Sequence, residues 1–169
     1  MAFFPDDLLE AAEALLNACR IRSLRVTTAE SCTGGLIAAL LTEIPGSSDV
    51  IGHGFVTYSN DAKQDMLGVR AETLAVHGAV SSETAQEMAS GALARAIPDA
   101  TLAVAVTGVA GPGGGSVKKP VGTVWLAVAS ASGETAAKKH LFRGNRSDIR
   151  YAAVECAITM LGLAVERAG

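Results

Sequence analysis

Residues 102–107 read LAVAVT and are followed by the glycine-rich run GVAGPGGG at residues 108–115. An apolar run of this length, without polar alternation, is typical of a strand that other elements cover on both faces. Strands of this kind occur in the sheets of α/β proteins, where helices pack on each side. This stretch therefore predicts an α/β fold, and the segments on either side of it are interpreted in that light.

Segments with strand and helix patterns alternate on both sides of this run. Strands are expected at residues 24–29 and 51–59, and a hairpin at residues 123–129 and 136–142 with its turn at Ser132 and Gly133. Apolar spacing and capping residues predict helices at residues 6–19, 36–42, 60–68, 81–96 and 146–166. This order predicts an α/β fold with a mixed β-sheet flanked by helices on both faces, a three-layer sandwich. No repeat or linker divides the sequence, so residues 1–169 are interpreted as one domain.

Composition excludes several classes of protein. The 169 residues are 49% hydrophobic with a net charge of -3, which argues against disorder and against a nucleic-acid binder with a basic face. Three widely spaced cysteines, Cys19, Cys32 and Cys156, fit neither a disulfide framework nor a zinc site, and they are typical of a reducing compartment. The first ten residues are acidic where a secretion signal is basic, and the apolar run at residues 158–165 is too short to cross a bilayer. We therefore expect a cytoplasmic protein with no membrane or nucleic-acid partner.

Residues 30–35, ESCTGG, form a loop between a predicted strand and a predicted helix. The hydroxyl of Ser31 would be exposed there beside free N–H groups at the helix start, which could hold a phosphate or a developing oxyanion. The alternative, that Ser31 is a simple helix cap, stays open. Cys32 is a competing nucleophile, but adjacent side chains on a turn seldom face the same ligand, so we interpret it as a packing residue.

A serine hydrolase needs a base, and the histidines His53, His77 and His140 show no motif spacing. Lys63 is the better candidate, because it lies near the start of a predicted helix. A neutral lysine needs a pKa well below the usual value of about 10.4, and both desolvation and a helix N-terminus act in that direction. Tyr58 could relay a proton or orient the lysine. The alternative, in which Lys63 extends into solvent, stays open.

Two further features suggest an anionic ligand and no metal. Residues 107–115 lack the ending of a Walker A loop, but their small side chains allow a ligand to approach the backbone, unless the segment is only a flexible crossover. Arg146 and Arg150 share one face at the start of the last helix, where positive charge is unfavourable. Either a bound anion compensates these charges, or Asp148 and Glu155 form ion pairs with the arginines.

No set of histidine, cysteine and carboxylate residues has metal-ligand spacing, so neither a metal nor another cofactor is expected.

Taken in order, these motifs resemble one family closely, the CinA C-terminal domain, which includes nicotinamide mononucleotide deamidases. The similarity runs from about residue 6 to 165 and is carried by residues 28–35, 56–60, 62–63, 67–69, 78–81, 107–114, 119–124, Phe142, Gly144, Arg146 and 149–150. One departure is Asn145, where aspartate is common in the family, and either residue can cap a helix. The chain begins shortly before its first predicted helix, so we expect the stand-alone form, without the nucleotide-pyrophosphatase-like domain of longer CinA proteins.

The resemblance implies hydrolysis of the carboxamide of nicotinamide mononucleotide (NMN) to nicotinate mononucleotide and ammonia, without a metal. Carried over residue by residue, Ser31 would be the nucleophile, Lys63 its base and Tyr58 an assisting group. The substrate-binding residues would be Glu30, Thr33, Gly34, Gly35, Thr107, Gly108, Gly111, Arg146 and Arg150. Which of Arg143, Arg146 and Arg150 contacts the phosphate stays open.

Two other functions stay open, a non-catalytic nucleotide-sensing module and an amidase for another phosphorylated carboxamide. Ser31, Tyr58 and Lys63 occur together, which argues against the sensing module, because binding alone does not need all three. A homodimer or homotrimer is expected, since small α/β domains often self-associate.

Overall fold

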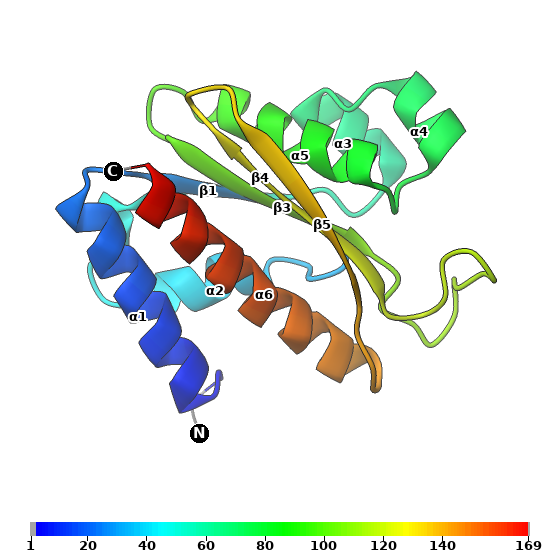
Figure 1. Cartoon of the computed structure of the whole chain (residues 1–169), viewed down its shortest axis with the longest axis horizontal. Coiled ribbons are helices and arrows are strands. Elements are labelled where there is room, and N and C mark those ends of the chain that lie inside the picture. The colour runs from blue at the N-terminus through cyan, green and yellow to red at the C-terminus, as the bar shows by residue number, and fades with distance from the viewer. Residues whose placement is uncertain (1–2, 169) are drawn as a thin grey trace.

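Strand β3 (Leu102–Gly108) lies at the centre of a five-stranded sheet with the order β2-β1-β3-β4-β5 (Figure 1). The structure is a computed structural model, and it describes residues 3–168. The other strands are β1 (Val26–Glu30), β2 (Ile51–Val56), β4 (Thr123–Ser130) and β5 (Thr135–Leu141). β1 pairs in parallel with β2 and β3, whereas the β3–β4 and β4–β5 pairs are antiparallel. The predicted mixed sheet is confirmed.

Helices cover both faces of this sheet (Figure 1), which confirms the predicted three-layer sandwich. One layer contains α1 (Asp6–Ile21), α2 (Leu36–Glu43) and α6 (Arg146–Arg167), and the other contains α3 (Asn60–Leu67), α4 (Ala71–His77) and α5 (Ser82–Arg95). A short 3-10 helix, η1 (Ser47–Asp49), precedes β2. Within residues 3–168, no helix combines the length and apolar character that a membrane span requires.

The central strands divide their side chains between two cores. In β3, Val104 and Val106 pack with α1, α2 and α6, whereas Ala103 and Ala105 pack with α5. The α5 side is built largely from alanines, so this helix can approach the sheet closely. At Gly91 of α5, an added Cβ would overlap the carbonyl oxygen of Leu67 in α3. The close approach of α3 and α5 therefore depends on a glycine.

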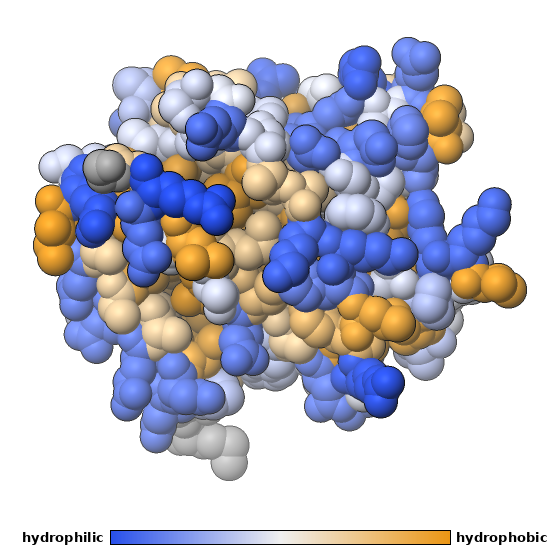
Figure 2. Space-filling view, in the orientation of Figure 1, coloured by the Kyte–Doolittle hydropathy of each residue, from blue (hydrophilic) through white to orange (hydrophobic). Residues whose placement is uncertain are grey.

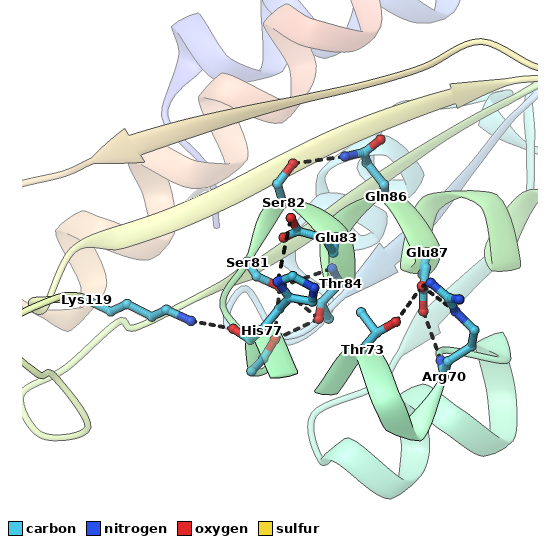
Figure 3. Close-up of polar contacts among 11 residues, drawn as sticks. Arg70, Thr73, His77, Ser81, Ser82, Glu83, Thr84, Gln86, Glu87 and Lys119 are labelled. Atoms are coloured by element: carbon cyan, nitrogen blue, oxygen red, sulfur yellow. Dashed lines mark hydrogen bonds and ion pairs between the residues drawn. The ribbon is translucent and has the colours of Figure 1, made fainter. Parts of the chain in front are cut away.

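Apart from η1 and shifts of one or two residues at element ends, the structure differs from the expected elements in two places. The strand expected at residues 51–59 ends at Val56, because Ser59 caps α3 with its side chain, which accepts a hydrogen bond from the Ala62 N–H at 3.0 Å. Helix α4 was not expected, and no side-chain cap marks its start. Contacts from a distant segment stabilise it, since Glu87 of α5 accepts hydrogen bonds from Arg70 and Thr73 (Figure 3).

Candidate active site

Three hydroxyl side chains lie at the carboxyl ends of the parallel strands β2, β1 and β3. The strand register aligns Ala29 with Phe55 and with Ala105, and Thr57, Ser31 and Thr107 lie two residues beyond these positions. The ladder continues past the strands, because the Ser31 N–H donates to the Val106 carbonyl at 2.9 Å and the Thr57 N–H donates to the Glu30 carbonyl at 2.8 Å. Side chains alternate along strands, so the row of hydroxyls lies on the face of the sheet that α5 covers.

Helix α3 places Lys63 against this row. The Lys63 Nζ lies 3.0 Å from Ser31 Oγ, and it donates hydrogen bonds to the carbonyls of Thr57 at 2.9 Å and Tyr58 at 3.3 Å. Lys63 is 1% exposed and Ser31 is 8% exposed. Lys63 does not extend into solvent, so that alternative is wrong.

The protonation of Lys63 follows from its surroundings. Burial lowers the pKa of its amine, because desolvation disfavours the charged form, while the nearby Cys32 acts weakly in the opposite direction. Lys63 forms no ion pair with a carboxylate among residues 3–168. A neutral amine has two N–H groups and one lone pair. The two N–H groups match the carbonyl acceptors of Thr57 and Tyr58, and the lone pair matches the proton of the Ser31 hydroxyl.

Cys32 lies next to Ser31 but in a different environment. It is 5% exposed and packs in the core formed by α1, α2 and α6. Burial raises the pKa of its thiol to about 11, so the thiolate that a cysteine nucleophile needs is disfavoured. The geometry agrees with its interpretation as a packing residue.

The Glu30 carboxylate occupies the start of helix α2. It is fully buried and accepts hydrogen bonds from the N–H groups of Gly35 at 3.0 Å, Ile37 at 3.0 Å and Ala38 at 2.9 Å. The prediction of free N–H groups at this helix start is therefore wrong for these three, because a carboxylate of the chain already neutralises the helix dipole. Glu30 holds the loop on the face of β1 opposite to Ser31, and its contact with a substrate stays a prediction.

The rest of this loop supplies the remaining donors. Cys32 and Thr33 have N–H groups without a hydrogen bond to another residue in the described part of the chain. Gly34 and Gly35 adopt positive φ angles of 62° and 95°, and a Cβ at Gly34 would lie 3.3 Å from Nη2 of Arg150. The two glycines thus allow the tight turn and the close approach of this arginine.

The two predicted arginines of α6 reach different parts of the site. Arg150 is part-buried and donates from Nε to the Cys32 carbonyl at 3.1 Å and from Nη2 to the Thr33 carbonyl at 2.9 Å. Arg146 is exposed and donates from Nη1 to the Gly111 carbonyl at 2.7 Å and from Nη2 to Tyr58 Oη at 2.9 Å. Within residues 3–168, neither arginine forms an ion pair with a carboxylate, so the salt-bridged surface face is wrong.

The phenol of Tyr58 makes no hydrogen bond with Lys63. Its side chain is 60% exposed and bonds to Arg146, while the backbone carbonyl of Tyr58 is the group that accepts a hydrogen bond from Lys63. Sequence reasoning placed the residue near the site but could not distinguish these two contacts. Its assisting role stays a prediction.

The glycine-rich connection between β3 and β4 is tied down at several points. Gly108 lies against β4, where an added Cβ would meet the Thr123 carbonyl at 2.9 Å, and Gly111 has a φ of 78°. Thr107 donates from Oγ1 to the Ala79 carbonyl at 2.7 Å, and Lys119 donates from Nζ to the His77 carbonyl at 2.6 Å (Figure 3). These contacts argue against a free crossover at the base of the loop. Sequence reasoning assigned no role to Lys119, because its partner lies on a helix that was not expected.

The chain is similar to known proteins over most of its length. A family model for the CinA C-terminal domain matches residues 9–165. The nicotinamide-nucleotide amidohydrolase PncC of Escherichia coli (strain K12) is 50% identical over 155 residues, which cover 92% of this chain and 93% of that protein. A CinA-like protein of Mycolicibacterium gilvum is 51% identical over 144 residues, which cover 85% of this chain and 34% of that protein.

A solved structure matches over almost the same length. The competence/damage inducible protein CihA from Agrobacterium tumefaciens has a TM-score of 0.93 and 52% sequence identity, with coverage of 98% of this chain and 99% of that one. The two folds therefore agree over almost the whole of both chains. The chain belongs to the CinA C-terminal domain family.

Proposed function

We propose that this chain is an amidohydrolase that converts NMN to nicotinate mononucleotide and ammonia. The observation that carries the proposal is the buried pair of Ser31 and Lys63, whose Oγ and Nζ atoms lie 3.0 Å apart. A buried lysine without a carboxylate partner is suited to act as a neutral base beside a serine. The substrate class is supported by the 50% identity to an E. coli nicotinamide-nucleotide amidohydrolase.

The reaction begins with the formation of an acyl-enzyme. Ser31 Oγ attacks the carboxamide carbon while its proton passes to Lys63 Nζ, and the carbonyl oxygen becomes an oxyanion. The N–H groups of Cys32 and Thr33 are the donors of this loop that remain for the oxyanion. Lys63 then gives its proton to the substrate nitrogen, the C–N bond breaks, and ammonia leaves.

Hydrolysis of the acyl-enzyme completes the cycle. A water attacks the ester carbon as Lys63 accepts a proton from it, and the ester bond to Ser31 Oγ breaks. The proton returns from Lys63 to Ser31 Oγ, and nicotinate mononucleotide leaves as the carboxylate after its new carboxyl group releases the second water proton to solvent. Lys63 thus moves a proton in both halves of the reaction, which requires an amine that is neutral at the start of each.

The phosphate of NMN is assigned to Arg146. Its guanidinium is exposed and lacks a carboxylate partner within residues 3–168, although it bonds to Gly111 and to the phenol of Tyr58. Tyr58 then assists by orienting this arginine. Arg150 is the weaker candidate for the phosphate, because its side chain is part-buried, whereas that of Arg146 is exposed, and it holds the carbonyls of Cys32 and Thr33.

Self-association into a homodimer or homotrimer is the second part of the proposal. A groove of about 1040 Å³ lies between β5 and α6, and its walls include Phe142, Met160 and Leu163. Figure 2 shows apolar side chains gathered in the middle of this face of the molecule. Sedimentation equilibrium at several protein concentrations tests this part, and a monomer throughout would contradict it.

The function is tested with purified protein and a panel of NMN, nicotinamide riboside, nicotinamide and NAD. Ammonia release and nicotinate mononucleotide are measured by an enzyme-coupled assay and by chromatography. We expect NMN to be the best substrate of the panel. Tight binding of NMN without turnover would support the nucleotide-sensing module, and faster turnover of another phosphorylated carboxamide would support the other amidase.

A further inference from the structure

The side chain of Thr57 is a buried hydroxyl for which the described part of the chain supplies no hydrogen-bond partner. Thr57 is 0% exposed, and its Oγ1 makes no hydrogen bond to any of residues 3–168. A buried hydroxyl without a partner destabilises a fold, whereas a valine of the same shape avoids that penalty. Threonine is thus an unfavourable choice for stability alone, and the position of this hydroxyl relative to Lys63 points to a function.

The sheet places this hydroxyl in the same buried layer as the lysine amine. Thr57 follows β2 directly beside Ser31, and its own carbonyl accepts a hydrogen bond from Lys63 Nζ at 2.9 Å. Phe55, two residues earlier, packs with α5, so strand alternation directs the Thr57 side chain to the same face. Lys63 approaches the sheet from this face.

The bonding capacity of Lys63 changes during the proposed reaction. The neutral amine has two N–H groups for the carbonyls of Thr57 and Tyr58, and its lone pair faces the Ser31 hydroxyl. After it takes the serine proton, the amine has three N–H groups, while Ser31 Oγ is engaged in the bond to the acyl carbon. Until it transfers its proton to the substrate nitrogen, the third N–H therefore needs another acceptor in this buried site.

We propose that Thr57 is a positioning residue whose Oγ1 turns toward Lys63 and accepts a hydrogen bond from the protonated amine. The inference rests on the proposed chemistry of Ser31 and Lys63. The contact forms only while Lys63 carries the proton, so it stabilises the charged intermediate and not the resting enzyme. Its loss slows the chemical step and leaves substrate binding unchanged.

The charged groups around Lys63 do not supply this acceptor. Cys32 is the titratable neighbour whose charge acts on Lys63, and burial raises the pKa of its thiol to about 11. The Glu30 carboxylate is engaged by N–H groups of α2, and the Glu87 carboxylate is engaged by residues of α4 and its N-cap. The other charged side chains near the α3 and α5 surfaces are exposed: Asp61, Asp65, Glu83 and Arg95.

The test compares Thr57→Val with Thr57→Ser and with a matched control, Thr28→Val. Thr28 is also a buried threonine whose Oγ1 has no partner among residues 3–168, but it lies on the opposite face of β1, near Gly54 and Ala38 of α2. Each valine variant should melt at the same temperature as the wild type or higher. Thr57→Val should lower kcat for NMN about tenfold at constant KM, Thr57→Ser should restore it, and Thr28→Val should change neither constant.

A second readout follows Lys63 directly. The titration is done in protein that carries Ser31→Ala, because the amine then lacks the Ser31 Oγ as an acceptor, as it does in the acyl-enzyme. With ¹³C-labelled lysine, the NMR signal that disappears in Lys63→Arg reports the titration of Lys63. Adding Thr57→Val should lower the pKa of Lys63 by about one unit, a tenfold change in protonation, because the charged amine has lost a further acceptor. Adding Thr57→Ser or Thr28→Val should leave this pKa unchanged.

Three results overturn the inference: an unchanged kcat in Thr57→Val, an equal loss of kcat in Thr28→Val, or a lower kcat without a shift in the pKa of Lys63. The last result would indicate a structural role only. If the wild type fails to hydrolyse NMN, the proposed function fails, and the NMR titration still decides the role of Thr57.

Discussion

Ser31 and Cys32 are neighbours in one loop, yet their side chains lie in different environments. Ser31 faces Lys63, whereas Cys32 packs in the core beneath the loop. We expect Ser31→Ala to lower kcat for NMN by about 10³-fold or more, because the proposed nucleophile is removed, with little change in the unfolding free energy. Cys32→Ala should keep substantial activity. Steady-state kinetics and urea unfolding check both, and loss of activity in the cysteine variant alone would contradict the assignment of the nucleophile.

Lys63 is the second residue whose chemistry can be tested alone. Burial lowers the pKa of its amine, so the neutral amine, which can act as a base, forms as the pH rises through a value below the pKa of a free lysine. We expect kcat/KM for NMN to fall on the acid side of this value. Lys63→Arg should be nearly as inactive as Lys63→Ala, because a guanidinium stays charged. A pH–rate profile that lacks this acid limb, or an active arginine variant, would exclude the role of base.

The same shift affects stability, with a sign that follows from proton linkage. The pKa of Lys63 is lower in the folded protein than in the unfolded chain, where it is about 10.4. At pH values between these two pKa values, the unfolded chain binds more protons than the folded protein. In that window, Lys63 therefore makes the free energy of unfolding increase as the pH rises. Below the window both states are protonated, and burial of the charged amine is a constant penalty. Lys63→Met should remove this contribution and flatten the dependence. Urea unfolding of both proteins across the window measures the difference.

At the scale of elements, helix α6 serves the site with two arginines that do different work. Arg150 holds the carbonyls of the Ser31 loop, and Arg146 links the phenol of Tyr58 to the glycine-rich connection. Both lie in the first two turns of the helix, which a capping box of Asn145 and Asp148 begins. The helix thus joins three segments that are far apart in the sequence.

This division of work predicts a difference between two alanine variants. Arg146→Ala should lower kcat/KM for NMN by a factor that corresponds to about 1.5–3 kcal/mol of transition-state stabilisation, the value of a hydrogen bond to a charged group. The variant should have little effect on kcat/KM for nicotinamide riboside, which has no phosphate. Arg150→Ala should lower turnover of both compounds, because it loosens the loop that carries the nucleophile. The comparison needs kcat and KM for each variant on both substrates. Equal losses on the two substrates in Arg146→Ala would refute its assignment to the phosphate.

At the scale of the whole molecule, the packing of one helix layer on the sheet decides where Lys63, the proposed base, lies. Lys63 is on α3, which contacts α5 at Gly91, where an added Cβ would overlap the Leu67 carbonyl. Gly91→Ala should therefore move α3, and we expect it to lower the unfolding free energy by about 1–3 kcal/mol and to reduce kcat. Activity and urea unfolding are measured together.

Gly162 of α6 provides the matched control, because an added Cβ there meets no atom within 4 Å. Gly162→Ala should raise the unfolding free energy by about 0.5–1 kcal/mol, the usual gain from alanine inside a helix, and leave kcat unchanged. If Gly91→Ala behaves like this control, the close approach of α3 and α5 does not position Lys63.

The sequence by itself determined the fold class, the single mixed sheet and most helices, because hydrophobic periodicity, caps and turns act over a few neighbouring residues. The apolar run of β3, the hairpin with Gly133 in its turn and the capping box of α6 are examples. Helix α4 escaped prediction because its stabilising contacts come from α5, and the end of β2 was set by the cap of the next helix.

Only the tertiary structure decided which residues meet at the candidate site. Ser31 and Lys63 are 32 positions apart, and Arg150 is 118 positions from the carbonyl of Cys32 that it holds. The burial that lowers the pKa of Lys63, the engagement of Glu30 by helix α2 and the unpaired hydroxyl of Thr57 likewise depend on strand register and on the packing of α2, α3 and α5. Contacts of this kind join residues whose separation no local pattern records, so their geometry exists only once the sheet and its two helix layers have assembled.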